Sequence, residues 1–115
     1  MAAKSRAKAA KKTKAVRGSR TGRPIMVLFD LLGRRWTLRL LWELRAGPMT
    51  FRQLRDAMED VSPSVLNERL RALRDANLVD RSEGEGYVLT EQAHALSEHL
   101  LPLDGWARSW ARGLR

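Results

Sequence analysis

Residues 50–76, TFRQLRDAMEDVSPSVLNERLRALRDA, contain two helix starts separated by one short turn. Thr50, with a glutamine three positions later, has the pattern of a capping box and predicts a helix over 51–58. Ser62 followed by proline has the N-cap and first-turn chemistry of a second helix, which we expect over 63–76. Two short helices separated by about four residues have the spacing of a helix-turn-helix, although many unrelated helix pairs share that spacing.

The segment before this pair is apolar and is divided by glycine and proline. Pro24 suits the first position of a helix, so the apolar stretch 25–32 is expected to be helical up to a following glycine. Residues 35–46, RWTLRLLWELRA, have apolar side chains around most of the helix surface. Such a wide apolar surface predicts a central helix packed on more than one side, ended by Gly47-Pro48. Met49 can then begin a very short strand.

The segment after the pair predicts a small β-hairpin and a long helix. Residues 78–81 and 87–89 are strand-like, and two glycines between them permit a tight turn. Thr90 can cap a final helix that runs toward residue 112. The expected order is helix, helix, short strand, helix, helix, hairpin, long helix. We therefore predict a mainly α fold with a small β-hairpin wing: a winged helix-turn-helix with a C-terminal dimerisation helix, over 25–115.

Apolar residues on the last helix recur at the spacing of a coiled-coil seam. They are Ala93, Leu96, Leu100, Leu103, Ala107, Trp110 and Leu114. Pro102 and Gly105 interrupt this helix and predict a kink or two helical pieces. A regular seam on a terminal helix favours contact with a second chain over burial in the chain's own core. The residues assigned to the interface of a homodimer are Leu96, Leu100, Leu103, Trp106 and Trp110.

The excess positive charge lies in the first 24 residues. The net charge is +9, from 22 lysines and arginines against 13 acids. Nine of the basic residues precede Pro24, in a segment without acids: Lys4, Arg6, Lys8, Lys11, Lys12, Lys14, Arg17, Arg20 and Arg23. Because Val16 is the only large apolar residue of this segment after the first methionine, we expect residues 1–24 to be disordered when free. The tail either only solubilises the chain or adds non-specific affinity for phosphate; an organellar transit peptide has similar composition.

The polar face of the helix over 63–76 has side chains that can recognise DNA. Leu66, Leu70 and Leu73 are expected to point inward, which turns the other face outward. The N-terminal part of the second helix of a helix-turn-helix meets base edges in the major groove. Asn67 can pair with adenine, Glu68 can accept from cytosine, and Arg71 can bind guanine. Ser62 and Ser64 suit phosphate contacts at the helix start, and Arg74 and Arg81 are further phosphate candidates.

A structural explanation of the same helix remains open. Glu68 with Arg71, and Arg71 with Asp75, can form surface ion pairs that stabilise the helix slightly. Arg69 borders the apolar face, so its stem is expected to pack and its head to bond a neighbouring helix. Glu91, His94 and Glu98 share a side of the last helix, but solvated side chains are the expectation there, and no metal or cofactor is predicted.

The motifs together resemble HxlR-type winged-helix transcriptional regulators, of the MarR-like superfamily. LLGRRWTLRLLWELRAGPMTFRQLRDAM is similar to the start of that family, and VSPSVLNERLRALRDANLVDR is similar to its recognition helix. GYVLTEQA matches the end of the wing, and LLPLDGWARSW is similar to the final helix. The matching positions include Gly33, Trp36-Thr37-Leu38, Gly47-Pro48, Phe51 and Leu54. The resemblance covers residues 24–112.

The sequence departs from the family pattern in three ways. The chain contains no cysteine, so the redox sensing that many members perform with a cysteine before the first helix is absent. The wing tip has Glu83 and Glu85, which disfavour a grip on phosphate through the tip. Ala93 replaces a usual glycine, and Asn77 stands where glycine is common, although asparagine tolerates a left-handed helix end.

The resemblance implies a cytoplasmic, nucleoid-associated homodimer that binds double-stranded DNA and regulates transcription. It implies no enzyme, and no catalytic constellation or hydrophobic segment of membrane-spanning length is visible in the sequence. An apolar small-molecule inducer is possible in a cleft near Trp42 or Trp106. Two alternatives remain: a nucleoid-associated protein of low sequence specificity, and a winged-helix module that binds protein.

Overall fold

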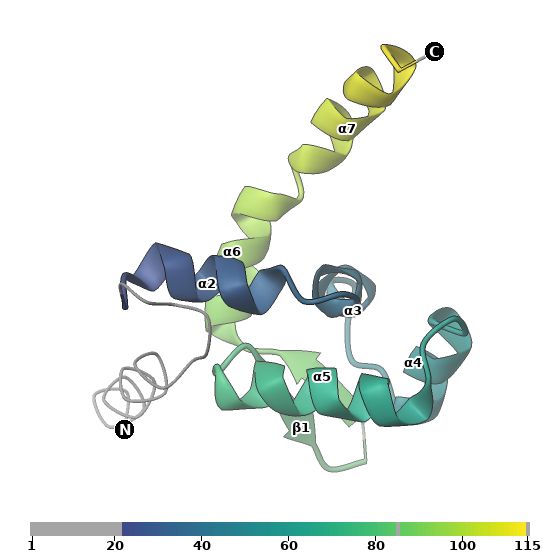
Figure 1. The fold of residues 1–115 in the computed structure, drawn as a ribbon. Coiled ribbons are helices and arrows are strands. Elements are labelled where there is room, and N and C mark those ends of the chain that lie inside the picture. The colour runs from purple at the N-terminus through teal and green to yellow at the C-terminus, as the bar shows by residue number, and fades with distance from the viewer. Residues whose placement is uncertain (1–21, 85, 115) are drawn as a thin grey trace.

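The computed structural model describes residues 22–84 and 86–114, which form six helices and one two-stranded sheet (Figure 1). The elements are α2 (Pro24–Leu32), α3 (Thr37–Leu44), α4 (Phe51–Ala57), α5 (Pro63–Asp75), β1 (Val79–Ser82), β2 (Gly86–Leu89), α6 (Glu91–Leu100) and α7 (Leu103–Arg112). This order confirms the expected mainly helical fold with a hairpin wing. The expected long C-terminal helix consists of two pieces that divide at Pro102, as predicted, whereas Gly105 lies within α7 and does not interrupt it.

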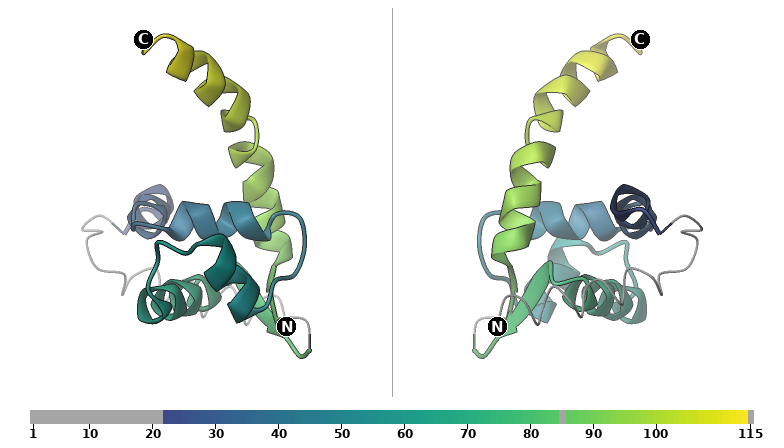
Figure 2. Two further views of the ribbon diagram at one scale, coloured as in Figure 1. Left: turned by 90° about the vertical axis from the view of Figure 1, so that its right-hand side faces the viewer. Right: turned by 90° about the vertical axis from the view of Figure 1, so that its left-hand side faces the viewer.

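Helix α3 lies at the centre of the molecule. Leu40, Leu41 and Leu44 are buried and belong to one core cluster with leucines of α4 and α5. The views in Figure 2 show α3 above α5 and beside α6. The wide apolar surface expected for this segment is therefore explained by packing on several sides.

The start of α3 differs from the expectation. A helix over 35–46 was predicted, but α3 begins at Thr37, because Trp36 has the left-handed backbone angle φ = 80°. A large aromatic residue rarely adopts this conformation. The preceding residue, Arg35, places its guanidinium 4.6 Å from the centre of the Trp36 ring.

The helix caps were predicted correctly from local hydrogen-bonding chemistry. Thr50 Oγ1 accepts from the Gln53 backbone at 3.1 Å, and Gln53 Oε1 accepts from the Thr50 backbone at 2.9 Å. Ser62 Oγ accepts from the Val65 backbone at 3.2 Å and caps α5. Thr90 Oγ1 accepts from the Ala93 backbone at 3.1 Å and caps α6. These bonds satisfy backbone donors that have no partner within the first helical turn.

The wing is tied to the loop before α4. Strand β1 pairs antiparallel with β2, with Val79 opposite Leu89. Met49 forms an isolated antiparallel bridge with Tyr87, through backbone N–O distances of 3.0 and 2.7 Å. Met49 pairs as an isolated bridge rather than as the short strand expected there, and this bridge anchors the hairpin to the body of the domain.

The two C-terminal helices have different surroundings, which divides the predicted seam. Ala93 of α6 is buried, and Leu96 and Leu100 are partly buried against the chain's own core. No residue of α7 is buried, and Leu103, Trp106 and Trp110 are exposed. Figure 2 shows α7 extending from α6 away from the rest of the described chain. Leu96 and Leu100 therefore have less surface available for a dimer interface than the sequence suggested, because they are partly buried within the protomer.

Candidate nucleic-acid interface

Helix α5 separates its residues cleanly into a buried and an exposed face. Leu66, Leu70 and Leu73 are no more than 1% exposed, as the helical wheel predicted. The seven side chains predicted to contact DNA are all exposed: Ser62, Ser64, Asn67, Glu68, Arg71, Arg74 and Arg81. The first six lie on or next to α5, and Arg81 lies on β1 of the adjacent wing. Exposure along one helix and its wing is the geometry that base and phosphate contacts require.

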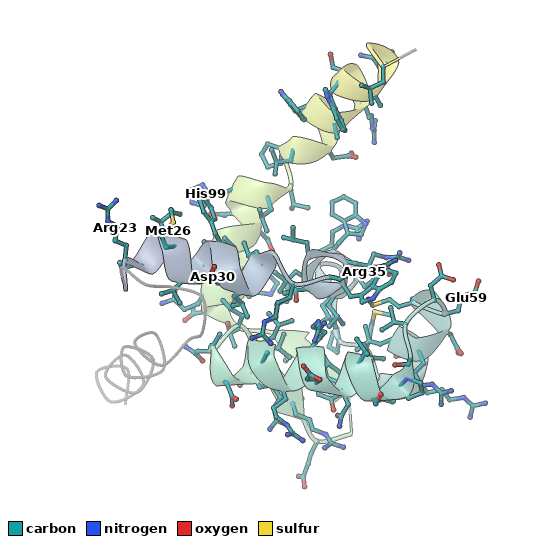
Figure 3. All side chains as sticks on the ribbon, viewed as in Figure 1. Arg23, Met26, Asp30, Arg35, Glu59 and His99 are labelled. Atoms are coloured by element: carbon teal, nitrogen blue, oxygen red, sulfur yellow. The ribbon has the colours of Figure 1, made fainter. Side chains whose placement is uncertain are left out.

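Arg69 holds α5 against the turn between α2 and α3. Its Nε donates to the Arg35 carbonyl at 2.9 Å, and its side chain is only 17% exposed. The sequence predicted a packed stem and a bonded head; the partner is the backbone of the turn rather than a helix. Figure 3 shows Arg35 at this junction. Arg69 therefore fixes the position of α5 relative to this turn.

Glu68 pairs with a different arginine from the one expected. Its Oε1 accepts from Arg69 at 3.1 Å, whereas the sequence suggested a pair with Arg71, three residues further along the helix. Because Glu68 remains 64% exposed, this pair contributes little to stability and leaves the carboxylate accessible.

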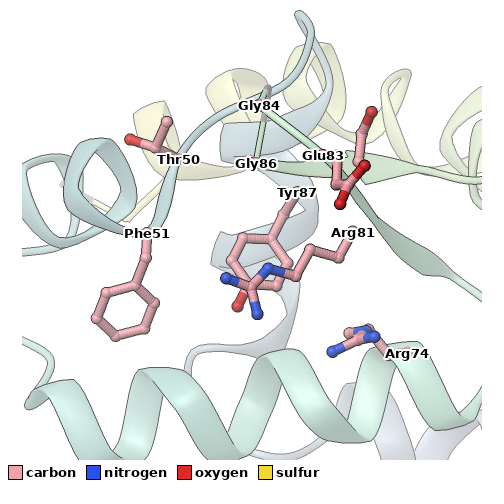
Figure 4. A pocket seen from close by; sticks show the side chains of 9 residues that line it. Thr50, Phe51, Arg74, Arg81, Glu83, Gly84, Gly86 and Tyr87 are labelled. Atoms are coloured by element: carbon pink, nitrogen blue, oxygen red, sulfur yellow. The ribbon is translucent and has the colours of Figure 1, made fainter.

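A cleft opens between α5, the start of α4 and the wing (Figure 4). Its volume is about 620 Å³, and Phe51, Arg74, Arg81 and Tyr87 line it together with wing residues. Arg81 extends beside the Tyr87 ring, 5.6 Å from its centre, and Arg74 reaches up from α5 toward the same space. Two positive charges from different elements therefore meet next to the predicted DNA-binding face.

Most of the predicted tail contacts lie outside the described residues. These are Lys4, Arg6, Lys8, Lys11, Lys12, Lys14, Arg17 and Arg20. Arg23 is described; it is exposed and occupies the N-cap position of α2. The wing-tip residue Glu85 is likewise outside the described residues.

Helices α2 and α7 both expose large apolar side chains, but the sequence analysis assigned only those of α7 to an interface. In α2, no residue is buried, and Ile25, Met26 and Phe29 are 47%, 37% and 55% exposed. Figure 3 shows Met26 on the side of α2 away from α5. In α7, the rings of Trp106 and Trp110 stack with centres 5.6 Å apart and are exposed to solvent. An apolar run alone could not show that α2 lies at the surface.

A second cavity of about 420 Å³ lies between α3 and the bend joining α6 to α7. Leu38, Trp42, Leu100 and Leu103 provide much of its apolar lining. Arg45 stacks over Trp42, with its guanidinium carbon 3.8 Å from the ring centre. Of the two tryptophans suggested for an inducer cleft, Trp42 therefore lines this cavity, and Trp106 is not among its lining residues.

Other kinds of site find no support in the described part of the chain. There, no group of three His, Cys, Asp or Glu side chains is arranged to hold a metal ion. No helix among these residues combines the length and apolar character needed to cross a membrane.

Comparison with known proteins identifies the family. The profile of the HxlR-like helix-turn-helix family matches residues 31–114. The chain belongs to the HxlR-like helix-turn-helix family. The HTH-type transcriptional regulator YodB of Bacillus subtilis is 31% identical over 85 residues, which are 69% of this chain and 76% of YodB. MJ0925 of Methanocaldococcus jannaschii, also an HTH-type transcriptional regulator, is 29% identical over 89 residues, 74% of this chain and 83% of the relative.

Solved structures of HxlR-like and MarR-family proteins have the same architecture. Quinone-bound YodB aligns with a TM-score of 0.69 at 32% identity, over 76% of this chain and 98% of YodB. A possible HxlR family factor from Thermoplasma volcanium aligns with a TM-score of 0.69 at 28% identity, over 78% and 86% of the two chains. This HxlR-like protein is therefore a winged-helix DNA-binding transcriptional regulator.

Proposed function

We propose that this HxlR-like regulator binds a specific pseudo-palindromic operator as a homodimer, with α5 of each protomer in successive major grooves. The observation that carries the proposal is the division of α5 into a leucine face buried in the core and an exposed polar face. Arg69 and the Ser62 cap hold this helix in place, so its outward side chains are presented from a rigid support. Rigid presentation favours sequence-specific contacts over loose association.

The proposed base contacts are made by Asn67, Glu68 and Arg71. All three side chains are exposed; Asn67 and Glu68 lie in the N-terminal half of α5, where major-groove contacts of this motif concentrate, and Arg71 follows within the next turn. Ser62 and Ser64 lie at the helix start, with oxygens 3.4 Å apart, and are assigned to phosphate. Each correct base contact is expected to discriminate by about 1–3 kcal/mol.

The reader assignment is tested with Asn67→Ala combined with Arg71→Ala. The variant should retain its thermal stability but lose discrimination between the selected operator and a scrambled duplex in fluorescence anisotropy. Arg112→Gln, an exposed change at the far end of the described chain, serves as the control. Full discrimination by the double variant would refute the assignment while leaving the fold unaffected.

The proposed dimer interface combines α7 with α2. Both helices expose large apolar side chains without burying any residue in the protomer. Exposed groups of large apolar side chains mark sites of protein association in soluble proteins. Leu103, Trp106 and Trp110 keep their assignment to the interface, Ile25, Met26 and Phe29 are added, and Leu96 and Leu100 have a smaller part because they support the core.

The basic tail is proposed to add affinity without adding sequence preference. Each phosphate that it neutralises should steepen the salt dependence of binding by about 0.9 on a log–log scale. Deleting residues 1–22 tests this and leaves Arg23 and Pro24, where α2 begins. Both forms should be compared for binding to random genomic fragments across a salt series. The truncated form should bind all sequences more weakly but select the same preferred motif.

The same experiment separates the proposal from its two alternatives. If neither form selects a motif, the sequence-specific regulator is refuted in favour of a nucleoid-associated protein of low specificity. If neither form binds DNA at low salt, a protein-interaction module is favoured instead. In that outcome the exposed face of α5 would have a protein partner.

A small apolar ligand is a second proposal, favoured by the cavity beside Trp42. YodB has been crystallised with a quinone bound, and the cavity here has a size typical of small-molecule sites. Titration with 1,4-naphthoquinone should quench tryptophan fluorescence, and the quenching should reverse on dialysis because the chain has no cysteine to form a thioether. A Trp42→Phe variant should lose the ligand-dependent change, and Trp106→Phe should keep it; the opposite pattern would exclude this cavity.

A further inference from the structure

We propose that Arg74 and Arg81 together bind one phosphate of the DNA backbone in the cleft between α5 and the wing, and that Glu83 weakens this contact. The inference rests on the proposed DNA-binding function of α5. It goes further by assigning both arginines to a single phosphate rather than to two independent contacts. It also gives the acidic wing tip a role.

The two arginines approach the cleft from different walls. Arg74 belongs to the last turn of α5, and Arg81 belongs to β1. Both line the cleft of about 620 Å³, and Figure 4 shows both side chains directed into it. Within residues 22–84 and 86–114, neither guanidinium forms an ion pair. Two cations that share one cleft and have no carboxylate partner among the described residues favour a single anionic group between them.

Tyr87 sets the direction of Arg81. The Tyr87 side chain is 6% exposed, and the Arg81 guanidinium lies 5.6 Å from its ring centre. A cation over an aromatic ring is stabilised by the electrons of the ring face, so fewer orientations of the arginine compete with the one that faces the cleft. This pre-orientation lowers the entropic cost of binding an anion.

The walls of the cleft are fixed relative to each other by the wing anchor. Two backbone hydrogen bonds join Met49 and Tyr87, and Met49 directly precedes the capping box of α4. Gly86 lies so close to this loop that a Cβ atom there would fall 2.6 Å from the Thr50 Cα. The wing therefore cannot swing freely away from α4, and the cleft keeps its shape before DNA arrives.

The ligand is assigned to the DNA backbone because the cleft adjoins the exposed face of α5. In the proposed complex, a strand that passes from the major groove toward the wing has its phosphates near the C-terminal end of this helix. Glu83 lines the same cleft from the wing tip, and its negative charge opposes a phosphate there. The tip is thereby disfavoured from entering the minor groove, and the arginines at the base of the wing make the contact instead.

The salt dependence of DNA binding tests whether one phosphate is shared. Arg74→Gln, Arg81→Gln and the double variant should be compared with the unchanged full chain on a selected operator duplex in sodium chloride. For a shared phosphate, the double variant should lower the log–log slope by about 0.9, and each single variant by less than this. Two separate phosphates would give a decrease of about 1.8 in the double variant, and this result would overturn the proposal.

Further variants control for net charge and test Glu83. Arg112→Gln also removes one positive charge, but on α7, and should leave the slope unchanged. Glu83→Gln should tighten binding to operator and random duplexes alike, whereas Glu98→Gln on α6 should not. Equal effects of Glu83→Gln and Glu98→Gln would overturn the part of the proposal that concerns the wing tip.

Failure of this inference is distinguishable from failure of the proposed function. If the double variant keeps the slope of the unchanged chain while sequence selection persists, the phosphate is bound elsewhere and the regulator remains. If inorganic phosphate shifts the Arg74 and Arg81 side-chain NMR signals while the DNA slope is insensitive to both substitutions, the cleft binds free phosphate and the assignment to DNA is overturned. Loss of sequence selection in Asn67→Ala with Arg71→Ala, in contrast, reports on base contacts alone.

Discussion

Replacing Arg69 by methionine removes the hydrogen bond that ties α5 to the turn between α2 and α3. Methionine retains an apolar stem of similar length, so the packing against the α5 core face is largely preserved. What is lost is the donor to the Arg35 carbonyl at 2.9 Å and the ion pair with Glu68 at 3.1 Å. The exposure of each partner residue gives a separate estimate of how much each interaction contributes to stability.

The backbone bond accounts for most of the expected effect. A hydrogen bond from a charged donor contributes about 1.5–3 kcal/mol, but Arg35 is exposed, so water replaces part of the interaction after the substitution. The ion pair adds little, because Glu68 is 64% exposed. We expect a destabilisation of about 1–2 kcal/mol, which for a domain of this size lowers Tm by about 5–15 °C.

Thermal unfolding followed by circular dichroism measures this change at one fixed protein concentration, because association would make Tm concentration-dependent. Arg71→Met is the matched control: it removes the same charge from the exposed side of the same helix, and it should change stability by less than about 0.5 kcal/mol. Glu68→Gln separates the ion pair from the backbone bond. Equal Tm values for Arg69→Met and Arg71→Met would refute the reasoning, and a loss in Glu68→Gln as large as in Arg69→Met would move the effect to the ion pair.

Three further substitutions test the cap, the wing anchor and the dimer. Ser62→Ala should lower the free energy of unfolding in urea by about 1 kcal/mol through loss of the α5 cap, and a loss no larger than that of Ser64→Ala would contradict this. Gly86→Ala should cost at least about 1–3 kcal/mol, because φ is 95° and the new Cβ would collide with the backbone at Thr50. Gly84→Ala has a similar φ of 80° but open space around it, so equal losses would refute the role of the close approach. Trp110→Glu should convert a dimer to monomers in analytical ultracentrifugation, whereas Ser109→Glu, with the same added charge on another side of α7, should not; an unchanged mass for Trp110→Glu would remove this residue from the interface.

Local hydrogen-bonding chemistry made the centre of the fold predictable from sequence. The capping box at Thr50, the Ser62 cap and the left-handed Asn77 with φ = 62° each depend on residues within a few positions of one another. The leucine spacing of α5 fixed which side chains face the core, and so which face outward. The candidate DNA face followed directly from that pattern.

Features that depend on distant parts of the chain were not predictable in the same way. The left-handed Trp36 interrupts an otherwise good helical pattern, and no neighbouring residue indicates it. The apolar residues spaced three and four apart in the C-terminal segment predicted which side of the helices is apolar. They did not predict whether that side packs against the protomer's own core or against a second chain. The core of the protomer contacts Leu96 and Leu100, whereas Trp106 and Trp110 have no such cover. The apolar composition of residues 25–32 predicted a helix, but composition alone did not show that this helix exposes its apolar side chains.

Because no residue of α7 is buried, the stability of this helix depends on contacts outside the protomer. It spans Leu103–Arg112, and a helix of about ten residues is barely stable in water without packing. Under the proposed assembly, its ordering and the association of two protomers are therefore one coupled transition. Helix content should fall as the protein is diluted below the dissociation constant of the dimer. Because ordering α7 costs entropy that association must offset, the fraction of protein able to bind DNA depends steeply on the concentration of the regulator in the cell.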